Sequence, residues 1–248
     1  MDKATHPTCL VHCLGLIDYE QAWRMQEILA VQIGAGGRPP TLLLLEHPHT
    51  YTFGRQGRAE NLLWDVEVLA RRGVRTYWVD RGGDVTYHGP GQLVGYPLLP
   101  LGPAQASKAA AERLPQADYL GYLRKLERML IAALQELGVA AGQLPGLTGV
   151  WSPAGAKLAA IGVKVDARGI SRHGFALNVS PDMSYWEGII GCGLRDTPST
   201  SLAKLLGTAP PMERVNQAIV RSFGEIFEYE MAAPSNGAGT FPPGLTSL

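Results

Sequence analysis

A cysteine between two glycines is the residue of this sequence best suited to covalent chemistry. Cys192 lies between Gly191 and Gly193, and Arg195 and Asp196 follow it. Glycine neighbours leave the backbone open enough for a substrate to reach the sulfur atom. A lone cysteine is more often a small buried apolar side chain, and the residues alone leave that interpretation open. A reactive thiol would suit a thioester substrate, because thiol–thioester exchange is nearly balanced in free energy and needs no ATP.

Lys157 is the residue that could activate such a thiol. A free cysteine has a pKa of about 8.5, so little of the reactive thiolate is present at neutral pH. A nearby ammonium group would stabilise the thiolate. Lys157 begins the apolar stretch KLAAIGVKV, in which strand alternation puts Lys157 and Lys164 on opposite faces. The alternative is a solvated lysine at the end of a strand.

Residues 81–92, RGGDVTYHGPGQ, are the most informative stretch of the sequence. They hold four glycines between two predicted strands, and glycine lets a ligand approach the backbone closely. Neither the GxxxxGK[ST] spacing of a phosphate-binding loop nor a GxGxxG that opens a helix is present. We therefore predict a binding loop that is not a nucleotide site, although an ordinary turn would account for a bare glycine pair. His88 is expected to bind substrate rather than transfer a proton.

The remaining cysteines and histidines do not form a metal-binding pattern. Cys9 and Cys13 have His12 between them, but no second ligand pair follows at a zinc spacing. We predict that both cysteines belong to the core of a strand. The other histidines are assigned to the wall of a substrate cleft or the surface (His47, His49) and to a structural or cleft-lining role (His173). No metal site is predicted.

A mixture of strands and helices must position these residues. Alternation predicts strands at 8–16, 41–45, 75–79, 92–98, 149–151, 157–165 and 174–179. Helices are predicted at 19–34, 66–72, 119–137, 202–206 and 212–227, with Asp18 and Asp118 as N-caps. Loops are predicted at 46–57 and 81–90, and a surface connection at 102–116. The order lacks strict βαβ alternation, which predicts an α+β fold with a mixed sheet packed with helices. Residues 1–230 are expected to form a single catalytic domain and 231–248 a flexible tail.

Composition narrows the choice of partners and of compartment. The 248 residues include 22 basic and 22 acidic side chains, so bulk charge favours neither nucleic acid nor an anionic membrane. No apolar run approaches the roughly 18 residues that a membrane span needs. Three cysteines, with no signal-peptide pattern before them, indicate free thiols in a reducing compartment. We expect a cytoplasmic monomer that binds neither nucleic acid nor membrane.

The string RGGDVTYHGPGQLVGYP at 81–97 resembles the signature of the lipoate-protein ligase B family, the octanoyltransferases. Further blocks similar to the family follow in its order: GVW at 149–151, KLAAIGV at 157–163, HGFALN at 173–178, CG at 192–193 and TSL at 200–202. The resemblance runs from about residue 14 to residue 227. One departure is Gly191, because the family usually has proline directly before its cysteine.

The resemblance implies a fold related to the biotin/lipoate ligase catalytic domain, with Cys192 as nucleophile and Lys157 as its activator. It implies transfer of an octanoyl (or lipoyl) group from acyl carrier protein to a specific lysine of a lipoyl domain, through an acyl-cysteine thioester and without a cofactor. This reaction would be the first step of endogenous lipoate assembly. The implied acceptors are the lipoyl domains of 2-oxoacid dehydrogenases and the glycine cleavage H protein. Substrate contacts are implied for Arg81, Gly82, Gly83, Asp84, Val85, Thr86, Tyr87, His88, Ala160, Ile161, Gly162, Gly174, Phe175 and Ala176.

Three other functions remain open. An ATP-dependent lipoate or biotin ligase would form an acyl-adenylate and would not need Cys192. A non-catalytic module that holds a carrier protein or a lipoyl domain would leave Cys192 and Lys157 without a role. A cysteine hydrolase would use water as the acceptor, so that no lipoyl domain would be required.

Overall fold

The described part of the chain, residues 6–101, 116–191 and 197–234 of this computed structural model, folds around a seven-stranded mixed sheet. The spatial order is β10 (Glu230–Ala232), β1 (Thr8–Leu16), β2 (Thr41–Glu46), β6 (Gln92–Leu98), β9 (Ser171–Asn178), β8 (Lys157–Val165) and β7 (Val150–Trp151). β1 pairs in parallel with β10 and β2, and the other neighbours pair antiparallel. A second sheet has the order β4 (Arg75–Trp78), β3 (Thr50–Phe53) and β5 (Val85–His88).

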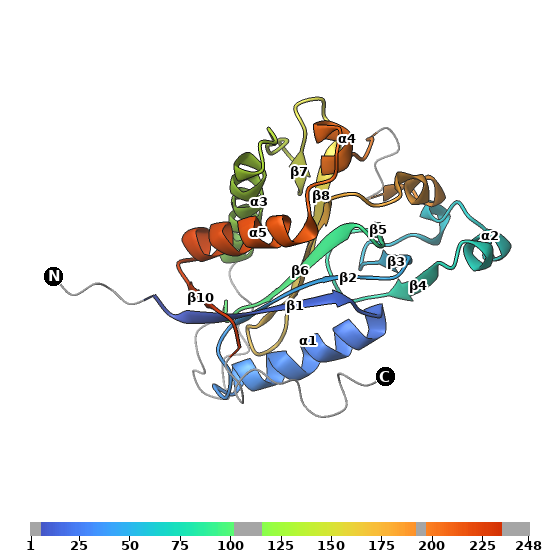
Figure 1. Cartoon of the computed structure of the whole chain (residues 1–248). Coiled ribbons are helices and arrows are strands. Elements are labelled where there is room, and N and C mark those ends of the chain that lie inside the picture. The colour runs from blue at the N-terminus through green and yellow to red at the C-terminus, as the bar shows by residue number, and fades with distance from the viewer. Residues whose placement is uncertain (1–5, 102–115, 192–196, 235–248) are drawn as a thin grey trace.

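Helices cover both faces of the large sheet (Figure 1). α1 (Tyr19–Gly34) packs on one face, and α3 (Gln116–Glu136) and α5 (Met212–Phe227) pack on the other. The connections hold α2 (Val66–Arg71), α4 (Leu202–Leu206) and two 3-10 helices, η1 (Ala59–Asn61) and η2 (Met183–Gly188). Within the three described ranges, no helix is long and apolar enough to cross a membrane.

The leucines of β2 show how the sheet is buried between its helices. Leu42 and Leu44 belong to the apolar cluster beneath α3 and α5, whereas Leu43 and Leu45 belong to the cluster beneath α1. All four side chains are at most 2% exposed. Burying each of them contributes about 1.5–3 kcal/mol relative to leaving it in water. The continuous LLLL run therefore follows from a strand that is buried on both faces.

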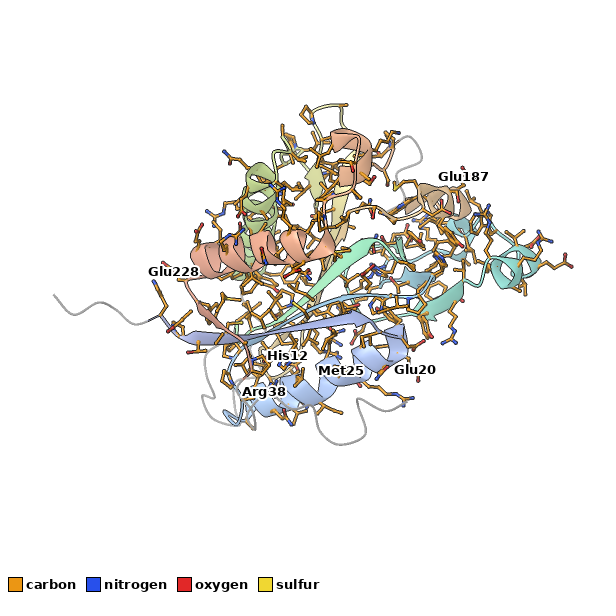
Figure 2. All side chains as sticks on the ribbon, viewed as in Figure 1. His12, Glu20, Met25, Arg38, Glu187 and Glu228 are labelled. Carbon is orange, nitrogen blue, oxygen red and sulfur yellow. The ribbon has the colours of Figure 1, made fainter. Side chains whose placement is uncertain are left out.

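The first helix begins where the sequence predicts it. The side chain of Asp18 accepts a hydrogen bond from the backbone N–H of Glu20 at 3.0 Å and so caps α1. Beyond the other end of α1, Nη2 of Arg38 donates to Nε2 of His12 at 2.9 Å, which ties the connection to β1 (Figure 2). The predicted bounds of the strand at 8–16 and of the helices at 202–206 and 212–227 are also confirmed.

Two predicted loops contain strands. The predicted loop 46–57 holds β3, and the predicted loop 81–90 holds β5; the two strands pair antiparallel in the small sheet. The sequences TYTF and VTYH are rich in aromatic and β-branched residues, which favour strands. Each strand is only four residues long and has glycine or proline nearby, so the turn signals hide it.

Two predicted boundaries are also wrong. α3 begins at Gln116, so Asp118 lies in its first turn rather than at its N-cap, because Gln116 and Ala117 continue the helix. The connection predicted at 102–116 lies almost entirely outside the described residues. Met231 and Ala232 belong to β10, which pairs with β1, so the fold extends past the predicted boundary at 230. Residues 235–248 of the predicted tail lie outside the described residues.

Candidate active site

Most of the residues expected to contact substrate line one cavity of about 50 Å³, the small cavity. Twelve of the fourteen do so: Arg81, Gly82, Gly83, Asp84, Thr86, His88, Ala160, Ile161, Gly162, Gly174, Phe175 and Ala176. They come from β5 and the turn before it, from β8 and from β9. Tyr19, Tyr96 and His173 complete the wall. The two segments from β8 and β9 meet because these strands pair antiparallel.

Val85 and Tyr87 do not line the small cavity. Both side chains are fully buried in the apolar cluster of the small sheet, with Tyr51 and Phe53. Successive side chains of a strand point to opposite faces, so Thr86 and His88 of β5 face the cavity while Val85 and Tyr87 face away. These two side chains therefore lie away from the small cavity, and their expected contact with substrate stays a prediction.

Two glycines in the wall of the small cavity allow neighbouring backbone to approach closely. A Cβ atom at Gly174 would lie 2.1 Å from the backbone oxygen of Gly95 on the neighbouring strand, which is impossible without separating the strands. A Cβ atom at Gly162 would lie 3.1 Å from the Cδ atom of Arg81 and from the oxygen of Gly82. Gly82 also donates its N–H to the oxygen of Val163 at 3.0 Å, which fixes the loop to β8.

Arg81 is a buried structural link as well as a wall residue. Its side chain is 7% exposed. Nη2 donates to the backbone oxygen of Thr52 at 2.6 Å and to its Oγ1 at 2.9 Å, and Nη1 donates to the oxygen of Gly82 at 2.9 Å. The guanidinium therefore holds the glycine-rich loop against β3.

His88 is held as a neutral ring at the wall of the small cavity. Nδ1 lies 2.9 Å from Oε1 of Gln92. Gln92 uses Nε2 to donate to the oxygen of Tyr87 and to Oδ1 of Asn178, so its Oε1 must accept and Nδ1 of His88 carries the proton. Burial is the main cause that lowers the pKa of His88 well below its ordinary value, and the nearby His47 lowers the pKa further. A neutral, hydrogen-bonded ring fits the expected binding role.

Asp80 organises a charged cluster beside the small cavity, and no motif or spacing in the sequence indicates this role. Its carboxylate accepts from Nε2 of His173 at 2.7 Å, from Nη2 of Arg172 at 2.6 Å and from Nζ of Lys164 at 2.5 Å. Burial raises the pKa of Asp80, but the bonds from His173 and Lys164 outweigh it and hold the pKa well below its ordinary value. Burial also lowers the pKa of His173, more than Asp80 raises it, so the ring donates as a neutral group. His173 thus combines the structural and cleft-lining roles expected for it.

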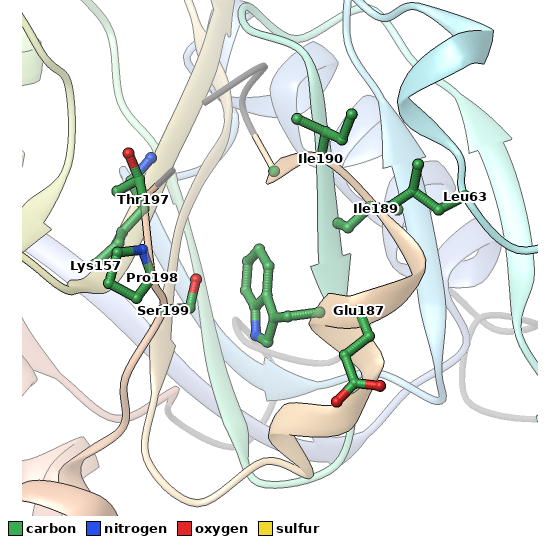
Figure 3. A pocket seen from close by; sticks show the side chains of 10 residues that line it. Leu63, Lys157, Glu187, Ile189, Ile190, Thr197, Pro198 and Ser199 are labelled. Carbon is green, nitrogen blue, oxygen red and sulfur yellow. The ribbon is translucent and has the colours of Figure 1, made fainter. Parts of the chain in front are cut away.

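A second, larger cavity of about 470 Å³, the large cavity, lies at the first residue of β8 (Figure 3). Its lining consists of Leu63, Lys157, Trp186, Glu187, Ile189, Ile190, Gly191, Thr197, Pro198 and Ser199. Lys157 is 6% exposed, so it is not a solvated lysine at a strand end. Its backbone N–H donates to the oxygen of Pro198 at 2.8 Å, and its oxygen accepts from the N–H of Thr200 at 2.9 Å. Its Nζ lies 4.6 Å from the centroid of the Trp151 ring.

Cys192 lies outside the described residues, as do Gly193, Arg195 and Asp196. Gly191 and Thr197 stand on either side of that segment, and both line the large cavity together with Lys157. The predicted pairing of Cys192 with Lys157 therefore stays a prediction. Lys164, which belongs to the Asp80 cluster, does not line the large cavity.

The other two cysteines are free. Cys9 is fully buried, and burial raises the pKa of its thiol to about 12, which makes it unreactive. Cys13 is exposed, so its predicted place in the strand core is wrong. Across the described ranges, no group of three or more His, Cys, Asp or Glu side chains is arranged to hold a metal ion.

The two histidines beside Pro48 differ in their environments. His47 is fully buried and bonds through Nε2 to the hydroxyl of Tyr96 and through Nδ1 to the oxygen of Ile17, both at 2.7 Å. Burial lowers the pKa of His47 to about 4. His49 stacks on Tyr185 with 3.9 Å between ring centroids. Neither side chain lines the small or the large cavity. The expected alternative of a surface position is wrong for His47, which is fully buried.

Two further buried polar residues support the site and were missed in the sequence. Glu127 of α3 is fully buried and accepts from the N–H of Gly149 at 3.0 Å, which positions the turn before Trp151. Asn61 donates from Nδ2 to Oδ2 of Asp84 at 2.5 Å. Both bonds join residues more than 20 positions apart, so no local pattern could have indicated them.

Comparison with known proteins shows which family the sequence matches. Residues 18–224 match the model of the lipoyl protein ligase A/B catalytic domain. The octanoyltransferase of Solibacter usitatus is 46% identical over 223 residues, which cover 90% of this chain and 94% of the relative. The octanoyltransferase of Chloroflexus aggregans is 46% identical over 222 residues, which cover 89% of this chain and 96% of the relative.

The fold is shared with solved lipoate-protein ligases. A lipoate-protein ligase A bound with ATP superimposes with a TM-score of 0.68 at 16% identity, covering 93% of this chain and 89% of the ligase. The bi-partite lipoate protein ligase of Thermoplasma acidophilum superimposes with a TM-score of 0.67 at 18% identity, covering 92% and 87%. Identities this low show the fold alone. The expected α+β fold, a mixed sheet packed with helices and similar to lipoate ligases, is confirmed.

Proposed function

This chain belongs to the octanoyltransferase family, and on that premise we propose that it carries the octanoyl group as a thioester on Cys192, from acyl carrier protein to a lysine of a lipoyl domain. One observation carries this proposal: Lys157 shares the large cavity with Gly191 and Thr197. Cys192 directly follows Gly191, so their Cα atoms are about 3.8 Å apart. A nucleophile at the edge of the large cavity would thus have a buried lysine in the same wall.

The reaction divides into two transfers that balance without ATP. The Cys192 thiolate attacks the carbonyl carbon of the octanoyl thioester, the bond to the donor sulfur breaks, and the donor thiolate takes a proton from Lys157. The amine of the acceptor lysine then attacks the acyl-cysteine, and Lys157 takes up the proton that the amine loses. A C–N bond forms, the C–S bond breaks, and Cys192 leaves as a thiolate. Formation of the amide makes the second transfer downhill.

The small cavity is the proposed site of the acyl tail. Its wall includes the apolar side chains of Ile161, Phe175 and two alanines, which suit a hydrocarbon chain. Ala160 follows Lys157 by three residues on β8, a separation of about 10 Å along a strand. The thioester at the large cavity and the acyl tail in the small cavity would therefore lie along one strand.

The proposed partners follow from this chemistry and from the family. Acyl carrier protein is the donor, and the lipoyl domains of 2-oxoacid dehydrogenases and the glycine cleavage H protein are the acceptors. The enzyme acts as a monomer and needs no cofactor. We assign it to the cytoplasm, where the free thiols of Cys9 and Cys13 stay reduced.

The deciding experiment is the intact mass of the protein after incubation with octanoyl-acyl carrier protein in the absence of ATP. We expect the gain of one octanoyl group, which proteolytic mapping assigns to Cys192 and which a lipoyl domain then removes. Cys192→Ser should abolish the gain, whereas Cys9→Ser and Cys13→Ser should keep it. Acylation of folded Cys192→Ser, or transfer only when ATP is added, would overturn the proposal in favour of an adenylate-forming ligase.

A further inference from the structure

We propose that Asn61 is a positioning residue that fixes the segment leading to Cys192 against the loop that lines the small cavity. The inference rests on the proposed function of Cys192. It concerns residues 54–63, the bridging segment, which includes η1. The bridging segment forms hydrogen bonds both to the loop that lines the small cavity and to residues 188–190, which lead to the large cavity. Asn61 contacts neither cavity itself, and it acts through the groups that it holds.

On one side, the bridging segment bonds to the glycine-rich loop. Four backbone N–H groups of the segment donate to this loop at 3.0–3.2 Å. The bonds run from Gly54 to the backbone oxygen of Asp84, from Arg55 to that of Arg81, from Gln56 to that of Gly83, and from Arg58 to Oδ1 of Asp84. These acceptors belong to residues that line the small cavity. The position of the bridging segment is therefore fixed by the wall proposed to hold the acyl tail.

On the other side, the bridging segment pairs with residues 188–190. The N–H of Leu63 donates to the oxygen of Gly188 at 2.8 Å, and Leu62 forms an antiparallel bridge with Ile189. The N–H of Ile190 donates to the oxygen of Asn61 at 2.9 Å. Figure 3 shows Leu63 beside Ile189, with Ile190 next along the chain toward the large cavity.

Asn61 makes a bond in each direction. Its Nδ2 donates to Oδ2 of Asp84 at 2.5 Å, while its backbone oxygen accepts from Ile190, two residues before Cys192. Asn61 is 7% exposed, so water does not compete freely for the bond to the carboxylate. A hydrogen bond to a charged group is about twice as strong as one between neutral groups.

This arrangement links the position of the acyl tail to the position of the thiol. Asp84 lines the small cavity, and Gly191 lines the large one. If the small cavity holds the acyl tail, a shift of residues 188–191 relative to Asp84 displaces the thiol from the carbonyl carbon that it attacks. A misplacement of about 1 Å costs on the order of a hundredfold in rate.

The first test is acyl-enzyme formation by Asn61→Ala with octanoyl-acyl carrier protein, followed by intact mass over time. We expect a maximal rate about ten- to a hundredfold below the wild type, with an unchanged dependence on donor concentration. Alkylation of Cys192 by iodoacetamide, in a Cys13→Ser background that removes the exposed thiol, should keep its wild-type rate because a small reagent needs no alignment. Asp65→Ala is the matched control: Asp65 caps α2 from the same connection but bonds to neither side of the bridge, so its acylation rate should not fall.

The second test exchanges the two partners. In the double variant Asn61→Asp, Asp84→Asn, the new amide can donate to the new carboxylate while its oxygen still accepts from Arg58 and Val85. Each single variant should be slow, and the double variant should recover most of the rate. Wild-type acylation by Asn61→Ala, or a double variant no faster than the slower single variant, overturns the role of Asn61. Failure of the proposed function is distinguishable, since the wild-type enzyme itself would then carry no octanoyl group on Cys192.

Discussion

The ammonium of Lys157 rests on the face of Trp151, with 4.6 Å between Nζ and the ring centroid. Trp151 is 1% exposed, and its backbone N–H and C=O both bond to Gly142. The ring is therefore a fixed support beneath the lysine. A cation over a tryptophan face gains up to about 2 kcal/mol when both groups are desolvated.

We expect Trp151→Leu to slow acyl-enzyme formation by about tenfold and Trp151→Phe to slow it less, because phenylalanine keeps a weaker ring face. Both variants leave space in the core. A loss of rate that is larger for Leu than for Phe therefore identifies the contribution of the aromatic ring face, the cation–π contact. Trp78→Leu is the control, since Trp78 is 60% exposed and far from this contact in the small sheet. Equal rates for the Phe and Leu variants would contradict the prediction.

Gly162→Ala should weaken binding of the octanoyl donor. The added methyl group would lie 3.1 Å from the Cδ atom of Arg81 and from the oxygen of Gly82, inside the proposed acyl site. One methylene in an apolar pocket is worth about 1–3 kcal/mol, so we expect the donor KM to rise about tenfold and shorter acyl donors to be less affected. The matched variant Gly121→Ala adds a methyl group on α3 with nothing within 4 Å, and its donor kinetics should stay unchanged. A Gly162→Ala enzyme with a wild-type KM for every chain length would show that the acyl tail binds elsewhere.

The small cavity shows how far the sequence predicts this site. The blocks at 81–88, 160–162 and 174–176 were each expected to contact substrate, and all three meet at the small cavity. The pairing of β8 with β9 joins the last two, and the bond from Gly82 to Val163 ties the first to β8. The side chains of Val85 and Tyr87 face away from the small cavity for a clear reason. When β5 is interpreted as a loop, every side chain is free to face the ligand, whereas a strand turns alternate side chains away.

The residues that hold the site in place could not be found in the same way. Asp80, Glu127 and Asn61 each bond to a partner that the fold brings near, over 93, 22 and 23 positions respectively. Nothing in the residues next to them distinguishes them from solvated acids or amides. Periodicity predicts elements and motifs predict chemistry, but the partner of a buried polar side chain depends on the packing of the whole fold.

Stability should fall in mild acid because His47 is buried as a neutral ring. Its pKa is lowered to about 4 by burial, whereas an unfolded histidine titrates near 6.5. Between these pH values the unfolded chain binds more protons than the folded one, so the free energy of unfolding rises with pH. The contribution of His47 is complete above about pH 6.5 and is lost as the pH falls to about 4. The full difference corresponds to roughly 3 kcal/mol.

Urea denaturation between pH 5 and pH 7 measures this dependence. His47→Gln should reduce the slope of the unfolding free energy against pH by almost one proton. Tyr96→Phe removes the hydroxyl that bonds to Nε2 of His47 but leaves the ring buried, so the slope should persist. A slope that is the same in wild type and His47→Gln would mean that His47 titrates normally in the folded protein.

The charge of Lys157 should set the reactivity of Cys192. An ammonium within about 4–6 Å lowers the pKa of an acid by about 1–3 units. Lys157 lines the large cavity together with Gly191 and Thr197, the residues on either side of the segment that contains Cys192. In Lys157→Met, we therefore expect the midpoint of Cys192 alkylation to move to higher pH by about 1–3 units, and acyl-enzyme formation at neutral pH to slow in proportion to the lost thiolate. The measurement is the alkylation rate against pH, again in the Cys13→Ser background.

Lys164→Met is the matched control, because it removes a lysine from the same strand whose Nζ binds Asp80. Its loss should leave the alkylation midpoint in place, apart from effects on the stability of the Asp80 cluster. A midpoint that moves in Lys164→Met but not in Lys157→Met would mean that Lys164 is the activating residue. A midpoint that moves only in His88→Ala or His173→Ala would replace the cysteine–lysine pair with a cysteine–histidine pair. Both rings line the small cavity and are held neutral by burial, so neither supplies the positive charge that the thiolate needs, and this leaves Lys157 as the residue that we expect the experiment to select.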